Sequence, residues 1–146
     1  MDNYKVLENQ SVTVSAAPAT VTYQVPPAAK TQLGGGSGPV PSPLATSVNT
    51  QSLVTSLYIC NTSSTASGPC SVVVDVSNYD SSSPVVTTLY DDLAVYGKTT
   101  FEVTLNLTLK ESDELRVTVS QIASFVPVID VTIFGIEMVR GVGPHG

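Results

Sequence analysis

Apolar and polar residues alternate strictly along one stretch of the chain, and this pattern constrains the fold more than any other feature. Between Phe101 and Leu109 every second residue is apolar, and the residues between them are Glu102, Thr104, Asn106 and Thr108. Because successive side chains of a strand point to opposite faces, the pattern predicts a long β-strand with one buried and one solvated face. After a polar turn the alternation resumes at Leu115, Val117 and Val119. We therefore expect the two stretches to pair as a β-hairpin.

Shorter apolar runs with the same period recur at regular spacing between turn residues. They predict further strands at 12–15, 21–25, 53–59, 72–76, 85–90 and 129–138. Val and Thr are abundant and pack well on a pleated surface, whereas no window shows a sustained helical period. A chain of 146 residues is long enough for one core. The sequence therefore predicts an all-β fold, a single antiparallel β-sandwich or jelly-roll-like domain of about eight strands.

Two parts of the chain lack this pattern. Residues 33–49 are rich in Gly, Pro and Ser, and residues 139–146 form a Gly-rich tail. We expect an N-terminal arm with a short strand at 1–17, a sandwich domain at 18–138 into which the 33–49 loop is inserted, and a C-terminal tail at 139–146. A long loop in a compact domain is usually functional or disordered. The expected partner contacts are Leu33, Gly34, Gly35, Gly36, Pro39, Val40, Pro41, Pro43, Tyr4, Arg140, Val142 and Pro144.

The charge of the chain argues against several classes of partner. The net charge is −6, and the six basic residues are scattered. A sequence-independent nucleic-acid binder needs clustered Lys and Arg, so no nucleic acid is expected as a partner. No apolar run approaches the ~20 residues that cross a bilayer, so no membrane partner is expected either. The first residues do not resemble a signal peptide, which predicts synthesis in a cytoplasm.

Residues suited to catalysis are few and badly placed. The single histidine, His145, lies on the Gly-rich tail, and no nucleophile, phosphate-loop or metal-ligand motif is present. No cofactor or metal is therefore expected. Carboxylates cluster at Asp91 and Asp92 and again at Glu111, Asp113 and Glu114. These clusters lack calcium-loop spacing, and turn or edge-strand solubility explains them better than catalysis does. A hydrolase that uses Asp91 or Asp92 is the least favoured alternative.

Cys60 and Cys70 flank a polar loop between two expected strands. If these strands pair as a hairpin, the thiols could form a disulfide. In a reducing compartment two free thiols are the ordinary state, and we favour this interpretation.

Several blocks of sequence, taken together, resemble small virion structural proteins of tailed bacteriophages. The blocks are Leu57–Ser64, Leu89–Leu93, the strand from Phe101, Leu107–Leu109, Asp113–Val117 and Phe134–Glu137. The resemblance implies a β-sandwich that cements or decorates a capsid by binding the major capsid protein, and it implies no catalytic residues. It also implies a place in the virion after synthesis in the host cytoplasm. Symmetric copies favour a homo-oligomer, and a trimer is expected for a cement protein.

The chain differs from the related proteins in the 33–49 insertion and in its extended ends, 1–17 and 139–146. Two alternatives therefore stay open. The protein could be a tail, neck, baseplate or fibre component of the virion. It could also be a carbohydrate- or receptor-binding module whose site is lined by exposed Tyr79, Tyr90 and Tyr96.

Overall fold

The computed structural model describes residues 4–27, 47–64, 69–79, 83–122 and 125–142, with only the backbone of 47–49 and 139–142 described. These residues form eight strands. They are β1 (Tyr4–Thr13), β2 (Ala19–Gln24), β3 (Ser47–Asn61), β4 (Cys70–Asn78), β5 (Val85–Val95), β6 (Thr99–Lys110), β7 (Glu114–Gln121) and β8 (Val128–Val142). The all-β prediction is confirmed.

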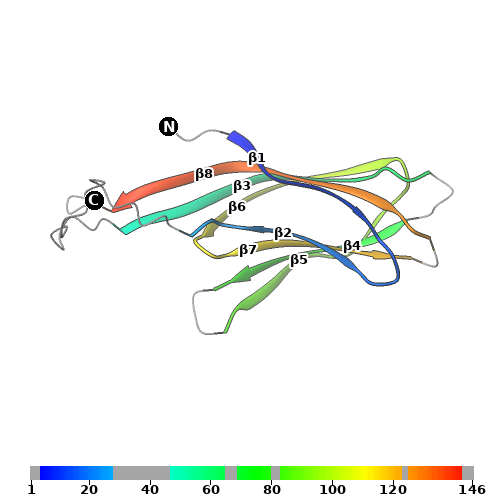
Figure 1. Cartoon of the computed structure of the whole chain (residues 1–146), viewed down its shortest axis with the longest axis horizontal. Coiled ribbons are helices and arrows are strands. Elements are labelled where there is room, and N and C mark those ends of the chain that lie inside the picture. Colours follow the sequence, from blue (N-terminus) through cyan, green and yellow to red (C-terminus); the bar gives the residue numbers. More distant parts are fainter. Residues whose placement is uncertain (1–3, 28–46, 65–68, 80–82, 123–124, 143–146) are drawn as a thin grey trace, which may run out of the picture.

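The strands form two four-stranded antiparallel sheets packed face to face (Figure 1). The strand orders are β1-β8-β3-β6, called sheet A below, and β2-β7-β4-β5, called sheet B. Only β4 and β5 are both consecutive in the chain and paired, and every other connection between described strands crosses from one sheet to the other. Two sheets wound in this way from eight strands form a jelly roll.

The hairpin predicted from the alternation between Phe101 and Val119 is wrong. The first stretch, β6, pairs with β3 in sheet A, and the second, β7, lies between β2 and β4 in sheet B. The buried side chain of Asp113 accepts hydrogen bonds from the backbone N–H groups of Lys110 at 3.0 Å and of Tyr79 at 3.1 Å. The backbone of Asp113 accepts a further hydrogen bond from Val25 at 3.0 Å. These contacts fix the turn against sheet B, so the chain crosses between the sheets.

The strand expected at 12–15 is longer and begins earlier, because β1 runs from Tyr4 to Thr13 along the edge of sheet A. Its alternation is hard to see in the sequence because an edge strand keeps most of its side chains exposed. At the other end of the chain, β8 continues to Val142, into the segment expected to be a tail.

The core lies between the two sheets and consists almost entirely of Val, Leu and Ile side chains. The alternating residues Leu115, Val117 and Val119 of β7 are fully buried in it, as the sequence predicts. On β6 the apolar face is only half-buried from Phe101 to Leu107, because β6 lies at the edge of sheet A. Each fully buried Val, Leu or Ile contributes roughly 1.5–3 kcal/mol of transfer free energy.

A row of β-bulges crosses sheet A at the level of Phe134. The register of β1 against β8 shifts between Val6 and Glu8, and the register of β3 shifts between Val54 and Ser56. On β6 the same level is marked by Asn106, which has a positive φ of 48°. Bulges bend a strand and increase its twist. The aligned bulges therefore bend sheet A between the part near Tyr4 and the part that continues to Thr13.

Candidate interaction surface

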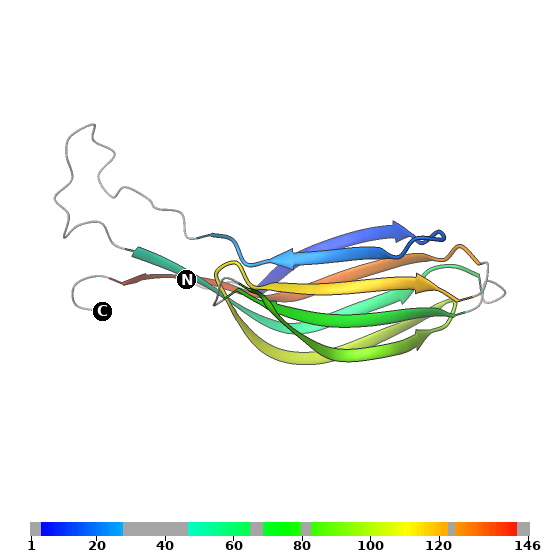
Figure 2. The same cartoon turned by 90° about the horizontal axis from the view of Figure 1, so that it is seen from below.

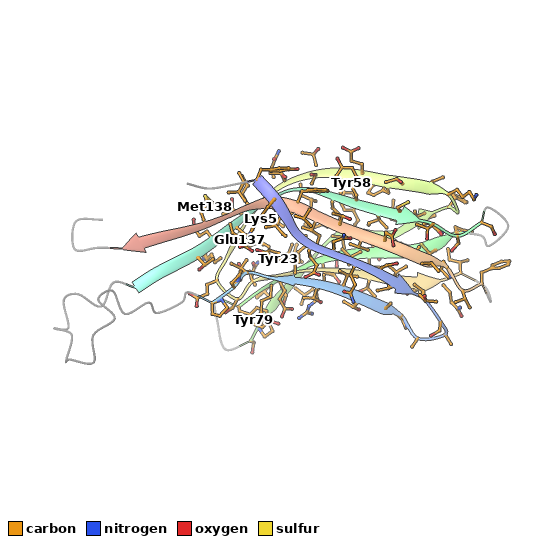
Figure 3. All side chains as sticks on the ribbon, turned by 45° about the horizontal axis from the view of Figure 1, so that its top comes forward. Lys5, Tyr23, Tyr58, Tyr79, Glu137 and Met138 are labelled. Carbon is orange, nitrogen blue, oxygen red and sulfur yellow. The ribbon has the colours of Figure 1, made fainter. Side chains whose placement is uncertain are left out.

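Aromatic side chains gather on the outer face of sheet A. Leu57 and Ile59 of β3 point into the core, so Tyr58 between them points outward. The same parity places Phe134 of β8 on the outer face, next to Ile133. Figure 3 shows Tyr58 on this side of the sandwich. Phe134 lies at the centre of the group because β8 is flanked by β1 and β3.

The rings contact one another in favourable geometries. Tyr4 stacks on Phe134 with ring centroids 6.0 Å apart and an interplanar angle of 6°. Tyr58 meets Phe134 edge to face at 5.3 Å and 79°. Aromatic pairs at these distances each add about 0.5–1.5 kcal/mol beyond the area that they bury. The cluster is therefore an ordered surface feature, although Tyr4 remains 58% exposed.

Aliphatic side chains extend the cluster towards the end of the sheet. Val6, which pairs with Phe134, is 48% exposed. Leu53 and Ile136 pair with each other and are half-buried on the same outer face. We call these neighbouring residues the aromatic patch: Tyr4, Val6, Leu53, Tyr58, Phe134 and Ile136.

Hydrogen bonds at the rim orient the two tyrosines of the patch. The hydroxyl of Tyr58 donates to Glu102 at 3.0 Å, and the pKa of Tyr58 is raised by this hydrogen bond first and then by desolvation and the carboxylate charge. The hydroxyl of Tyr4 lies 3.4 Å from that of Ser56, and hydrogen bonds from Ser56 and Thr55 lower the pKa of Tyr4. The patch thus has an apolar centre and a polar rim, the anatomy of a protein interface.

The other outward surfaces carry polar contacts, and their exposed apolar residues lie on β5 (Val85 and Val86) and between β7 and β8 (Ile122, Phe125 and Val126). Past Phe134 the outer face of sheet A continues with Thr132, whose hydroxyl donates to Asn9 at 3.2 Å. On the outer face of sheet B, the hydroxyls of Thr20 and Thr118 lie 3.3 Å apart, and Arg116 forms an ion pair with Glu114 at 2.6 Å. Contiguous exposed apolar patches mark interaction sites, whereas scattered apolar residues do not. The aromatic patch, in which three rings contact one another, is therefore our candidate interaction surface.

A polar network lies behind the patch and joins the two sheets. Tyr23 of β2 donates to Glu137 of β8 at 2.9 Å and accepts from Ser52 of β3, whose hydroxyl is 2.7 Å away. Lys5 of β1 donates to the other carboxylate oxygen of Glu137 at 2.7 Å. Figure 3 shows Lys5, Glu137 and Tyr23 close together near the end where β3 and β8 project.

The ionisation of this network favours a charged Glu137. Burial alone would raise the pKa of Glu137, but the hydrogen bonds from Lys5 and Tyr23 and the charge of Lys5 outweigh it and lower the pKa. Burial is also the main reason why the pKa of Tyr23 is raised, and the bond to Glu137 adds to the effect.

Only part of the predicted contact set can be placed. Tyr4 lies in the aromatic patch, and the backbone of Arg140 and Val142 belongs to β8. Residues 33–43, with all the contacts predicted there, and Pro144 lie outside the described residues. The sequence interpretation missed Val6, Tyr58 and Phe134. The alternation of Tyr4 and Val6 around Lys5 was the available signal, and it is only three residues long.

The three tyrosines proposed for a carbohydrate site are not brought together. Tyr79 directly follows β4 and Tyr96 directly follows β5, and these strands are antiparallel, so the two residues lie at opposite ends of the sandwich. Tyr90 is half-buried and packs against Phe101 at 5.9 Å. That version of the carbohydrate hypothesis is therefore wrong.

The carboxylates take part in structural contacts. Asp113 anchors its turn, Glu114 pairs with Arg116, and Asp92 accepts a hydrogen bond from Ser71 at 2.6 Å. The described residues contain no group of three or more His, Cys, Asp or Glu that could hold a metal ion. They also include no helix long and apolar enough to cross a membrane. His145 lies outside them.

Both thiols are free in the structure. Cys60 is on β3 in sheet A and Cys70 is on β4 in sheet B, so the hairpin that would have favoured a disulfide does not form. The buried thiol of Cys70 lies 3.6 Å from the carbonyl oxygen of Val95, and burial raises its pKa.

Comparisons with known proteins add a likeness of fold. No protein-family model and no curated protein matches the sequence. A structure of infectious bursal disease virus, Gx strain, aligns with a TM-score of 0.50 at 11% identity and covers 97% of this chain and 32% of its own. A structure of Desmodium yellow mottle tymovirus aligns with a TM-score of 0.43 at 13% identity and covers 97% of this chain and 90% of its own. The chain thus spans about a third of the first neighbour, with which it shares a β-sandwich fold.

Proposed function

We propose that this chain is a non-enzymatic structural protein of a bacteriophage virion, and that it decorates or cements the capsid. The observation that carries the proposal is the aromatic patch on the outer face of sheet A, where Tyr4 and Tyr58 both contact Phe134. A fold shared with a viral protein supports a virion role. The bacteriophage assignment rests on the sequence blocks, among them Leu57–Ser64 and Phe134–Glu137.

In this role the sandwich is a rigid spacer that presents its patch to the major capsid protein. An aromatic centre with few charges and a polar rim suits a surface that is desolvated on binding. The contacts between Tyr4, Tyr58 and Phe134 order the rings before binding, which lowers the entropic cost of association. Residues 33–46, the part of the expected loop that precedes β3, and both ends of the chain supply further contacts, and the protein acts as a homo-oligomer, a trimer at a capsid junction.

The test is the occupancy of purified heads by variants of the protein. Tyr4→Ser combined with Val6→Thr removes the most exposed part of the patch and is expected to reduce occupancy strongly while the domain stays folded. Deletion of residues 34–43 is expected to abolish occupancy. Thr20→Ser combined with Thr22→Ser, on the outer face of sheet B, is the matched control and should bind normally. If both the patch variant and the deletion occupy heads as the wild type does, the proposal fails.

A tail, neck, baseplate or fibre component is the second candidate, because the same patch and fold would serve there. The number of copies in each particle separates the two positions. Hundreds of copies support a cement protein, and a dozen or fewer support the tail or neck. A receptor- or glycan-binding module would instead give a signal on a glycan array that Tyr4→Ser removes.

A further inference from the structure

One end of sheet A consists of only two strands. The first four residues of β3 pair with the last four of β8, from Ser47 opposite Val142 to Thr50 opposite Val139. The pairing of β6 with β3 ends at Gln51, and the pairing of β1 with β8 begins at Ile136. Figures 1 and 2 show β3 and β8 projecting past the other strands. Within the described part of the chain, this two-stranded ribbon has no strand on either side.

A two-stranded ribbon is an unusual way to end a sheet. Two strands alone are marginally stable in water, and three or more are normally needed. A free edge also presents unpaired N–H and C=O groups that can pair with another chain. The ribbon is therefore a place where an added strand would gain hydrogen bonds and also stabilise the strands already present.

The other edges of the two sheets carry the features that prevent edge-to-edge pairing. On β1 these are the bulge near Leu7 and the charges of Lys5 and Glu8. On β6 they are the charges of Glu102 and Lys110 together with the bulge at Asn106.

The edges of sheet B are protected as well. On β5 the protection comes from Asp91, Asp92 and register shifts against β4. The strand β2 has six residues and lies between Pro18 and Pro26. Charges, bulges, prolines and short strands are the recognised protections of an exposed edge.

The β3 edge beyond its pairing with β6 has none of these features. Its residues are Ser47, Val48 and Asn49, with no charge, proline, glycine or register shift among them, and the next residue, Thr50, is buried. The corresponding part of β8 carries Arg140 and Gly141. A chain of net charge −6 repels its own copies, and an uncharged edge lets a second copy approach without adding to that repulsion.

We propose that the β3 edge from Ser47 to Asn49 pairs antiparallel with the same edge of a second copy across a two-fold axis. Antiparallel pairing of one edge with itself is self-complementary, as a two-fold interface requires. Val48 of each copy then lies opposite Val48 of the other, with Ser47 opposite Asn49, and the two ribbons become one four-stranded sheet in the order β8-β3-β3-β8.

This inference rests on the proposed virion role and deepens it, because it names one surface through which copies from neighbouring trimers meet. Three residues on each side form a small contact, so the dimer is weak in free solution. On a particle, neighbouring copies are held close together and the same pairing is effectively intramolecular, which strengthens it.

The test places like charges on the edge and measures self-association by sedimentation at protein concentrations up to about 1 mM, at which a weak dimer is visible. Val48→Lys with Asn49→Lys places lysines of both copies opposite each other, and Val48→Glu with Asn49→Glu does the same with carboxylates. Each variant alone should associate at least roughly tenfold more weakly than the wild type, because like charges face each other across the pair. An equimolar mixture of the two variants should recover the association.

Thr20→Lys combined with Thr22→Lys on β2 adds the same charge elsewhere and should leave association unchanged. Circular dichroism checks that every variant is folded. The proposed pairing is wrong if the wild type shows no concentration-dependent association. It is also wrong if mixing the two variants does not restore association. Either result would follow if residues 28–46 covered the edge. Head occupancy is measured independently, so a wild type that occupies heads but does not associate in solution would overturn this inference and leave the proposed function standing.

Discussion

At the scale of single residues, Gly135 shows how closely the strands of sheet A approach at the bulge. A Cβ atom built on Gly135 would collide with the backbone carbonyl oxygen of Leu53 and would lie 2.7 Å from a methyl group of Leu7. The Leu7 side chain can move, but the Leu53 carbonyl belongs to the paired strand β3 and cannot move alone. Glycine is therefore required here because two backbones meet closely.

We expect Gly135→Ala to destabilise the protein by about 1–3 kcal/mol, the usual cost of overpacking. Urea denaturation measures the change. Thr104→Ala, an exposed substitution at the same level of β6, is the control and should stay within about 0.5 kcal/mol of the wild type. An equally small effect of Gly135→Ala would show that β3 and β8 can separate at this point.

The sequence predicted which side chains of a strand point into the core, but it could not predict that position 135 requires glycine. The alternation of Leu115, Val117 and Val119 predicted three residues that are fully buried. Nothing around Gly135 distinguishes a glycine that is needed for close approach from one that is tolerated, because the clash comes from Leu53, which is 82 positions earlier in the chain.

At the scale of elements, the bulge in β6 depends on the left-handed conformation of Asn106, with φ at 48°. Asparagine tolerates this region better than most residues, whereas a β-branched residue is strained in it. We expect Asn106→Val to cost about 1–2 kcal/mol and Asn106→Gly to be close to neutral. Thr104→Val, in the regular part of the same strand, should cost little. Thermal unfolding of the three variants tests the prediction, and equal effects of Val at both positions would contradict it.

The pairing of elements is where prediction from sequence failed. The strands at 99–110 and 114–121 were predicted close to their observed bounds, because alternation is a local property of the chain. Their predicted pairing was wrong, because a short polar turn is compatible both with a hairpin and with a crossing between sheets. The buried carboxylate of Asp113 decides between them through Tyr79, which is distant in sequence. The aromatic patch was missed for a related reason, since its residues come from three strands.

At the scale of the whole molecule, one charged group holds the two sheets together at the end where the ribbon projects. Glu137 in sheet A accepts hydrogen bonds from Tyr23 in sheet B and from Lys5 at the sheet edge. The pKa of Glu137 in the folded protein is lower than its ordinary value of 4.5. A carboxyl whose pKa is lowered by folding stabilises the protein above its unfolded pKa, and this contribution is lost as the pH falls through the folded pKa.

We therefore expect Glu137→Gln to destabilise the protein by about 1–2 kcal/mol at neutral pH, a modest loss because Lys5 is half exposed. The difference from the wild type should shrink as the pH falls below 4.5, since Glu137 then becomes protonated and neutral like the glutamine. Urea midpoints measured from about pH 7 to about pH 3 test this expectation. Asp91→Asn, which removes an exposed carboxylate of β5, serves as the control. If the wild type and Glu137→Gln lose stability in parallel over this range, the ionised network does not join the sheets, and the packing of the core alone holds this end of the sandwich closed.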